Sequence, residues 1–104
     1  MEPESSPLLS KGYTGSHKIQ GMGMSLGVVP KIYNNNLSDE VLTCKCDDAI
    51  STMKELALKE GIFAGISTGA VIFTALEMAK KNSGKGLRIV VLSVDSGEKY
   101  FSVI

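Results

Sequence analysis

Two short, almost wholly apolar runs constrain the fold of this chain most strongly. They are IFAGIS at 62–67 and LRIVVLS at 87–93. Runs of this kind are typical of strands in parallel sheets, because helices cover both faces of such a sheet. Between them, 68–81 has the character of a helix, and Lys80 and Lys81 suit its C-terminal end. The pattern predicts a βαβ unit with parallel strands and a right-handed crossover, and therefore an α/β fold.

A further strand and helix are expected before this unit. The segment DEVLTCKC at 39–46 predicts a strand. In 49–60, apolar residues recur at helical spacing, and Gly61 can take the left-handed conformation that closes a helix. A short helix is expected to begin near Gly97. Residues 37–104 are therefore expected to form an αβ core portion.

The first third of the chain, 1–36, shows little periodicity. It holds five of the eleven glycines and all three prolines. This composition predicts a long loop-rich segment. Because a structureless stretch of this length is uncommon within a compact domain, we expect it to pack against protein outside this chain.

Length and charge exclude several classes of function. The chain has 104 residues, enough for one domain at most, and its 11 Lys and Arg balance 11 Asp and Glu. Without a cationic excess, non-specific binding to nucleic acid or to a membrane surface is not expected. No apolar run reaches the roughly 18 residues of a membrane span, and the N-terminus lacks the layout of a signal peptide.

The two cysteines, Cys44 and Cys46, lie two apart in the predicted strand. A disulfide at this spacing would distort an extended backbone, and His17 is the only histidine, so we expect no metal site. Two reduced thiols indicate a cytoplasmic protein, whereas a redox pair is the alternative. An organellar form stays compatible with the sequence, because Met1 need not be the natural start.

The segment GISTGA at 65–70 is the strongest local candidate for a site. Ser67 stands at the carboxyl end of a predicted strand, where ligands gather in open α/β sheets. Gly65 and Gly69 lack Cβ atoms, so either backbone or a ligand could approach closely. One hypothesis is an anion bound at the helix N-terminus. The other is a plain N-cap by Ser67 or Thr68, with glycine needed only for packing.

Five blocks along the chain resemble a known enzyme family. In order they are EPESSPLLS, HKIQGMG, DEV, GISTGA and SGEKYFS. Their order and spacing are similar to the C-terminal part of cysteine synthase (O-acetylserine sulfhydrylase), a pyridoxal-phosphate enzyme of the tryptophan-synthase-β fold type. The likeness runs from Glu2 to about Ser102. It implies a fragment of a three-layer αβα fold, in which 1–36 is the active-site-mouth region.

The resemblance also implies roles for particular residues. Ser67 matches the serine that faces the pyridine nitrogen of the cofactor, while the phosphate is held by a loop upstream. A hydroxyl can donate a hydrogen bond without transferring its proton, so the ring nitrogen stays largely neutral, which favours loss of a β-leaving group. Gly21, Met22 and Gly23 would line the substrate mouth, unless the glycines serve only turns. His17 would belong to a structural loop.

The blocks that carry the Schiff-base lysine, the substrate-carboxylate loop and the phosphate loop in this family have no counterpart in the chain. The implied parent reaction replaces the acetate of O-acetylserine with sulfide to form L-cysteine, and the chain alone is expected to be inactive. The family implies a homodimer and binding to serine acetyltransferase. Two alternatives remain: a sibling resembling cystathionine β-synthase, or a non-catalytic interaction remnant. Val94-Asp95 departs from the usual Pro-Ser, and Lys99 from the usual Arg.

Overall fold

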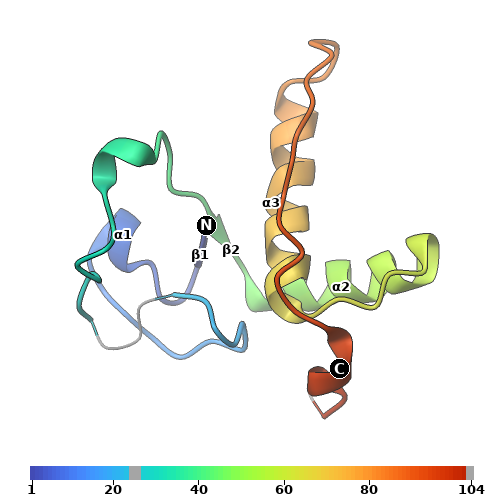
Figure 1. Ribbon diagram of the computed structural model, residues 1–104, viewed down its shortest axis with the longest axis horizontal. Coiled ribbons are helices and arrows are strands. Elements are labelled where there is room, and N and C mark those ends of the chain that lie inside the picture. Colours follow the sequence, from blue (N-terminus) through green and yellow to red (C-terminus); the bar gives the residue numbers. More distant parts are fainter. Residues whose placement is uncertain (24–26, 103–104) are drawn as a thin grey trace.

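The computed structural model describes residues 1–23 and 27–102. Helices dominate the second half, and the first third consists mainly of loops that lie to one side of the two long helices (Figure 1). None of the helices in the described part is both long and apolar enough to cross a membrane. The elements in chain order are β1 (Glu2–Pro3), α1 (Leu8–Lys11), η1 (Asn35–Leu37), β2 (Thr43–Cys44), α2 (Cys46–Glu60), α3 (Ile66–Lys81) and η2 (Gly97–Tyr100).

Strands β1 and β2 form a parallel pair, which confirms the predicted α/β class with parallel strands. Glu2 aligns with Thr43 and Pro3 with Cys44. The strand predicted at 39–46 is therefore much shorter than expected. Its partner β1 ends early because the chain turns after Glu4, with the amide of Ser6 donating to the Pro3 carbonyl at 3.0 Å. The amides of Glu2 and Glu4 make the bonds to β2, so Pro3 does not interrupt the pairing.

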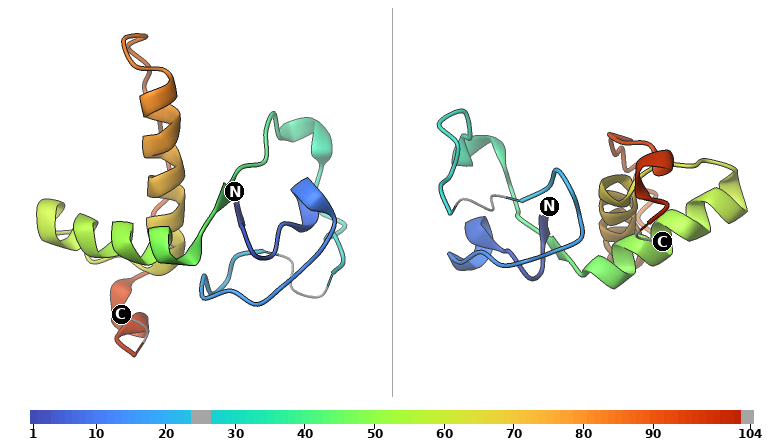
Figure 2. Two further views of the ribbon diagram at one scale, coloured as in Figure 1. Left: turned by 180° about the vertical axis from the view of Figure 1, so that it is seen from behind. Right: turned by 90° about the horizontal axis from the view of Figure 1, so that it is seen from below.

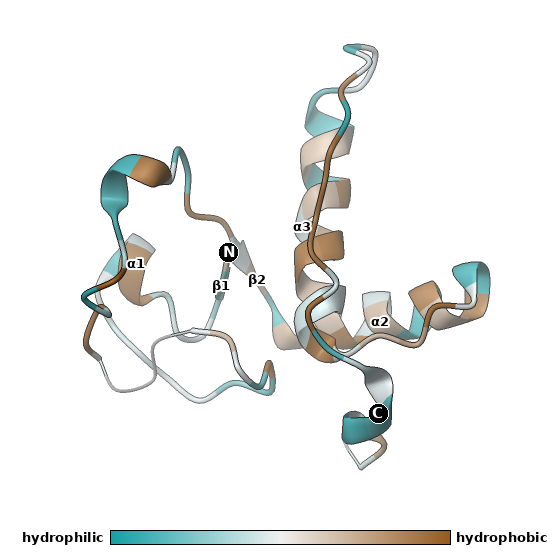
Figure 3. Ribbon diagram, viewed as in Figure 1, coloured by the Kyte–Doolittle hydropathy of each residue, from teal (hydrophilic) through white to brown (hydrophobic). Residues whose placement is uncertain are grey.

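The two apolar runs do not pair with each other as predicted. Neither 62–67 nor 87–93 forms a strand, and the ladder around them is reduced to one antiparallel bridge between Ala64 and Ser96. The run at 87–93 is extended and lies beside α3, with its apolar residues in view (Figure 3). A parallel strand takes its hydrogen bonds from neighbouring strands, and the described part of this chain supplies none at this position. The parallel βαβ pairing of these runs is therefore wrong within this chain.

Both long helices lie close to their predicted positions. Helix α2 begins at Cys46 and carries Asp47 and Asp48 in its first turn. It ends at Gly61, whose φ of 69° is left-handed and whose amide donates to the Ala57 carbonyl at 3.1 Å. The prediction that Gly61 closes this helix is confirmed. Helix α3 ends at Lys81, also as predicted.

The core of the chain lies where α2 and α3 cross, as the two views of Figure 2 show. At this crossing, Gly69 of α3 faces Ala49 and Met53 of α2, and a Cβ atom at position 69 would overlap the Ala49 carbonyl oxygen. Glycine is therefore required for this close approach of two helix backbones. The buried hydrophobic cluster around it comprises Ile19, Cys44, Ala49, Met53, Ile66, Ala70 and Tyr100.

Candidate functional site

The N-terminus of α3 is capped by a side chain from far along the sequence. The N-cap residue is Gly65, which has no side chain to offer, and the carboxylate of Asp95 takes its place. Asp95 Oδ1 accepts from the amides of Gly65 at 3.0 Å and Thr68 at 3.2 Å, and Oδ2 accepts from the amide of Ser67 at 3.0 Å. The prediction that Ser67 or Thr68 caps the helix is therefore wrong.

The hydroxyl of Thr68 belongs to the same hydrogen-bonded cluster. It donates to Asp95 Oδ1 at 2.6 Å and accepts from the amide of Val94 at 3.2 Å, and the residue is fully buried. Tyr100 adds a further donor, because its hydroxyl lies 3.3 Å from Asp95 Oδ2. Burial first, and the Asp95 carboxylate second, raise the pKa of Tyr100 above its usual value. The only sequence signal for this cluster was the departure of Val94-Asp95 from the family pattern.

The two glycines that flank Ser67 admit protein atoms. A Cβ atom at Gly65 would overlap the Asp95 carboxylate, and one at Gly69 would overlap the backbone of α2. Either backbone or a ligand could have approached these glycines, and the structure shows protein atoms beside both. Gly65 and Gly69 are therefore needed for packing, since the space beside each is already filled.

The hydroxyl of Ser67 links α3 to the predicted mouth loop. Ser67 is only 5% exposed, and its Oγ donates to the backbone carbonyl of Gln20 at 2.9 Å, across 47 positions of sequence. Gly21 and Gly23 have φ values of 79° and 84°, which L-residues with side chains rarely adopt. These glycines are thus required by the turn, whatever else they do.

A cavity of about 540 Å³ brings most of the predicted site residues together. Among the described residues that line it, Ser67 supplies the one hydroxyl, and Gly21 and Met22 form part of the wall. Gly23 is not among the lining residues and packs instead towards Pro3 and His17. The rest of the wall is apolar and consists of Val71, Val90, Val91, Leu92 and Val94.

The histidine and the cysteines stand apart from this cavity. Nδ1 of His17 has no hydrogen-bond partner in the described part of the chain. Both thiols are free, and Cys46 Sγ accepts from the amide of Lys18 at 3.2 Å. Burial raises the pKa of the Cys44 thiol to about 12, which keeps that sulfur protonated and unreactive. The described residues contain no group of three or more potential metal ligands.

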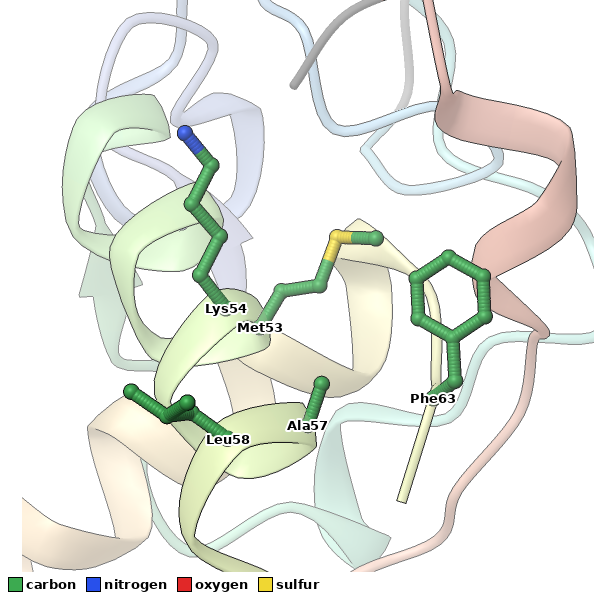
Figure 4. A pocket seen from close by; sticks show the side chains of 5 residues that line it. All are labelled: Met53, Lys54, Ala57, Leu58 and Phe63. Carbon is green, nitrogen blue, oxygen red and sulfur yellow. The ribbon is translucent and has the colours of Figure 1, made fainter. Parts of the chain in front are cut away.

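A second hollow, of about 360 Å³, lies between α2 and Phe63 (Figure 4). Its described lining residues include none of the predicted site residues, and Lys54 is the one ionisable residue among them. The remaining walls are formed by Met53, Ala57, Leu58 and Phe63. The cavity at Ser67 is the candidate functional site, because it contains three of the predicted site residues and the described lining of this hollow contains none.

Comparison with known proteins finds relatives along nearly the whole chain, although no protein-family model matches it. Cysteine synthase B of Campylobacter jejuni is 50% identical over 102 residues, which are 98% of this chain and 32% of that protein. The solved structure of a hydrogen sulfide-producing enzyme from Fusobacterium nucleatum is 62% identical, with a TM-score of 0.93 over 96% of this chain and 33% of that one. A cysteine synthase from Entamoeba histolytica is 35% identical, with a TM-score of 0.89 over 98% of this chain and 30% of that one.

The fold and the comparisons first define the class that the chain resembles, the α/β enzymes of the cysteine synthase type, a family that generally depends on pyridoxal phosphate. Within this class the chain matches the C-terminal region of cysteine synthases, which confirms the resemblance carried by the five sequence blocks. The chain spans about a third of the length of the relatives that it matches.

The cavity can be tested against the cofactor that this class uses. Among the described lining residues, the Ser67 hydroxyl is the one polar side-chain group, and once turned from the Gln20 carbonyl it would donate to a neutral ring nitrogen. The apolar residues around it suit an aromatic ring. No lysine is among the described residues that line it. The residues therefore fit the pyridine end of pyridoxal phosphate and supply no covalent anchor for it.

Proposed function

We propose that this chain is the active-site-bearing C-terminal segment of an enzyme that replaces the acetate of O-acetylserine with sulfide to form L-cysteine. The observation that carries the proposal is the buried hydroxyl of Ser67, held at the start of α3 and lining a cavity with Gly21 and Met22. The 50% identity with cysteine synthase B supports the assignment of the parent reaction.

Each part of the cavity has a role in this proposal. Ser67 donates a hydrogen bond to the ring nitrogen of pyridoxal phosphate, which when bound withdraws electrons from the substrate Cα. The valines beside α3 exclude water and present an apolar surface to the ring. Gly21 and Met22 form the substrate mouth. The chain alone is inactive in this proposal, because no lysine is among the described residues that line the cavity.

The Ser67 hydroxyl has one proton and therefore one donated hydrogen bond. That bond goes to the Gln20 carbonyl in the structure, at 2.9 Å. Donation to a ring nitrogen requires the hydroxyl to rotate away from Gln20. Binding of the ring and anchoring of the 20–23 loop thus compete for the same hydroxyl proton. In this proposal, a ring bound in the cavity therefore releases the loop that forms the substrate mouth.

A second candidate function rests on the neighbour from Fusobacterium nucleatum. At 62% identity it is more similar to this chain than cysteine synthase B is, and it produces hydrogen sulfide. Release of sulfide is the alternative reaction for the parent. In either case we propose small-molecule substrates, a homodimeric parent that binds serine acetyltransferase, and a cytoplasmic location.

A chimera tests both candidates. Residues 1–104 replace the matching 102-residue segment of cysteine synthase B, and the product is assayed for cysteine formation from O-acetylserine and for sulfide release from cysteine. We expect the chimera to bind pyridoxal phosphate and to form cysteine, while the 104-residue chain alone does neither. Ser67→Ala should lower the turnover of the chimera, and Ser51→Ala, an exposed change on α2, is the matched control.

Sulfide release exceeding cysteine formation would select the second candidate. A folded chimera that binds no cofactor would overturn both, because the cavity would then lack its assigned ligand. Unchanged activity and cofactor spectrum in Ser67→Ala would remove the role given to this hydroxyl.

A further inference from the structure

Asp95 collects more hydrogen bonds than any other side chain in the described part of the protein. Its two carboxylate oxygens accept from the amides of Gly65, Ser67 and Thr68 at the start of α3, and from the hydroxyls of Thr68 and Tyr100. Bonds from backbone amides to a carboxylate are charge-assisted and stronger than those between neutral groups. One side chain thus organises the whole first turn of the helix that carries Ser67.

The arrangement holds Ser67 from two sides. Its amide is bound by Asp95 Oδ2 at 3.0 Å, from 28 positions downstream, and its hydroxyl is bound by the Gln20 carbonyl at 2.9 Å, from 47 positions upstream. The first bond sets the backbone and the second sets the direction of the side chain. Gly65 makes the first bond possible, because any side chain there would occupy the space of the carboxylate.

The charge of Asp95 also has a local consequence. The N-terminus of a helix carries a partial positive charge, and a carboxylate in its first turn offsets it. A ligand at Ser67 therefore meets a hydroxyl donor beside a helix end whose charge is already compensated. This environment suits a neutral ring nitrogen better than it suits an anion, which would be repelled by the carboxylate.

We propose that Asp95 is the positioning residue for Ser67: its carboxylate holds the Ser67 backbone so that the hydroxyl is presented to the cavity, and it compensates the helix end that a neutral ring nitrogen would approach. This inference rests on the proposed function for the role of Ser67. The holding of the Ser67 backbone can be measured without any cofactor.

The test is amide hydrogen exchange and side-chain NMR on the 104-residue chain. Asp95→Ala should lower the protection of the Ser67 and Thr68 amides by roughly tenfold, as expected from the loss of a helix cap. Because the released backbone no longer holds Ser67 Oγ within reach of the Gln20 carbonyl, the three-bond couplings that report the Ser67 χ1 angle should change from one rotamer to an average. Asp47→Ala, at an exposed position in the first turn of α2, is the matched control and should change neither measurement.

Two further variants separate charge from hydrogen bonding and guard against unfolding. Asp95→Asn keeps one oxygen acceptor and loses the charge. It should therefore leave part of the protection of the Ser67 and Thr68 amides that Asp95→Ala removes. Asp95→Ser keeps one hydroxyl acceptor and should leave more protection of the Ser67 and Thr68 amides than Asp95→Ala does, if the chain stays folded.

The proposal would be overturned by equal protection of Ser67 and Thr68 in the unaltered and Asp95→Ala chains. Absence of protection of these amides in the unaltered chain would overturn it as well. So would a Ser67 χ1 rotamer that is the same in the unaltered and Asp95→Ala chains. A chimera that fails to bind cofactor while these amides stay protected would instead refute the proposed function alone.

Discussion

Replacing Gly69 with alanine tests how closely α2 and α3 approach. In an exposed helix the change would stabilise the protein by about 1 kcal/mol, because alanine favours helix more than glycine does. Here the new Cβ would overlap the Ala49 carbonyl oxygen, and it would lie 3.0 Å from the amide nitrogen and 3.1 Å from the Cβ of Met53. Ordinary contacts of a Cβ atom begin near 3.4 Å.

The clash is with helix backbone, which cannot rotate away as a side chain does. Overpacking of this kind costs about 1–3 kcal/mol, and the upper half of that range applies when backbone must move. Subtracting the gain in helix propensity leaves a net loss of roughly 1–2 kcal/mol. Gly69→Ala is therefore expected to lower the free energy of unfolding, whereas the same change at an exposed helix position would raise it.

The assay is urea unfolding followed by the circular dichroism of the helices. Ser51→Ala on the exposed face of α2 is the control and should stabilise slightly, by about 0.5 kcal/mol, through propensity alone. If Gly69→Ala matched this control, or raised the unfolding midpoint, the close crossing of the two helices would be refuted.

Three other changes test separate features. In a Cys46→Ser background, Cys44 should react with a disulfide reagent at pH 8 far more slowly when folded than in urea, because burial raises its pKa from 9.0 to about 12; equal rates would contradict this. Since the pKa of Cys44 is higher in the folded chain than in the unfolded one, the stability that its buried, protonated thiol contributes is complete below pH 9.0 and is lost as the pH rises toward 12. The free energy of unfolding, measured over a series of pH values, checks this. Gly61→Ala should destabilise by about 1 kcal/mol in urea unfolding, because φ there is 69°; no loss would argue against the left-handed cap. Tyr100→Phe removes a donor to Asp95 and should cost roughly 0.5–1.5 kcal/mol, and an unchanged midpoint would show that this bond is not made.

The long helices could be predicted because their signals are local. The apolar spacing of α2, its closing glycine and the lysines at the end of α3 all lie within the segments that they define. The strands could not be predicted in the same way. The apolar runs at 62–67 and 87–93 predict buried strands, but neither forms one here, and Ile66 and Ser67 instead begin α3. Pairing depends on which strands lie beside a run, and that information is not local.

The candidate site shows the same division. The order of the motifs predicts Ser67 and Gly21 as site residues, and the structure places both on one cavity. In the sequence, Asp95 stands out only as a departure from the pattern of the family that the chain resembles. Its carboxylate displaces the expected Ser or Thr cap because two charged oxygens satisfy more amides than one hydroxyl does.

The sequence by itself determined where α2 and α3 form and which enzyme family the chain resembles, since helical hydrogen bonds join residues four apart and motifs are written in order along the chain. Only the tertiary structure decided that Asp95 caps α3 and that the Ser67 hydroxyl bonds to Gln20. Those contacts join residues 28 and 47 positions apart, so they exist only after the chain has brought its distant parts together.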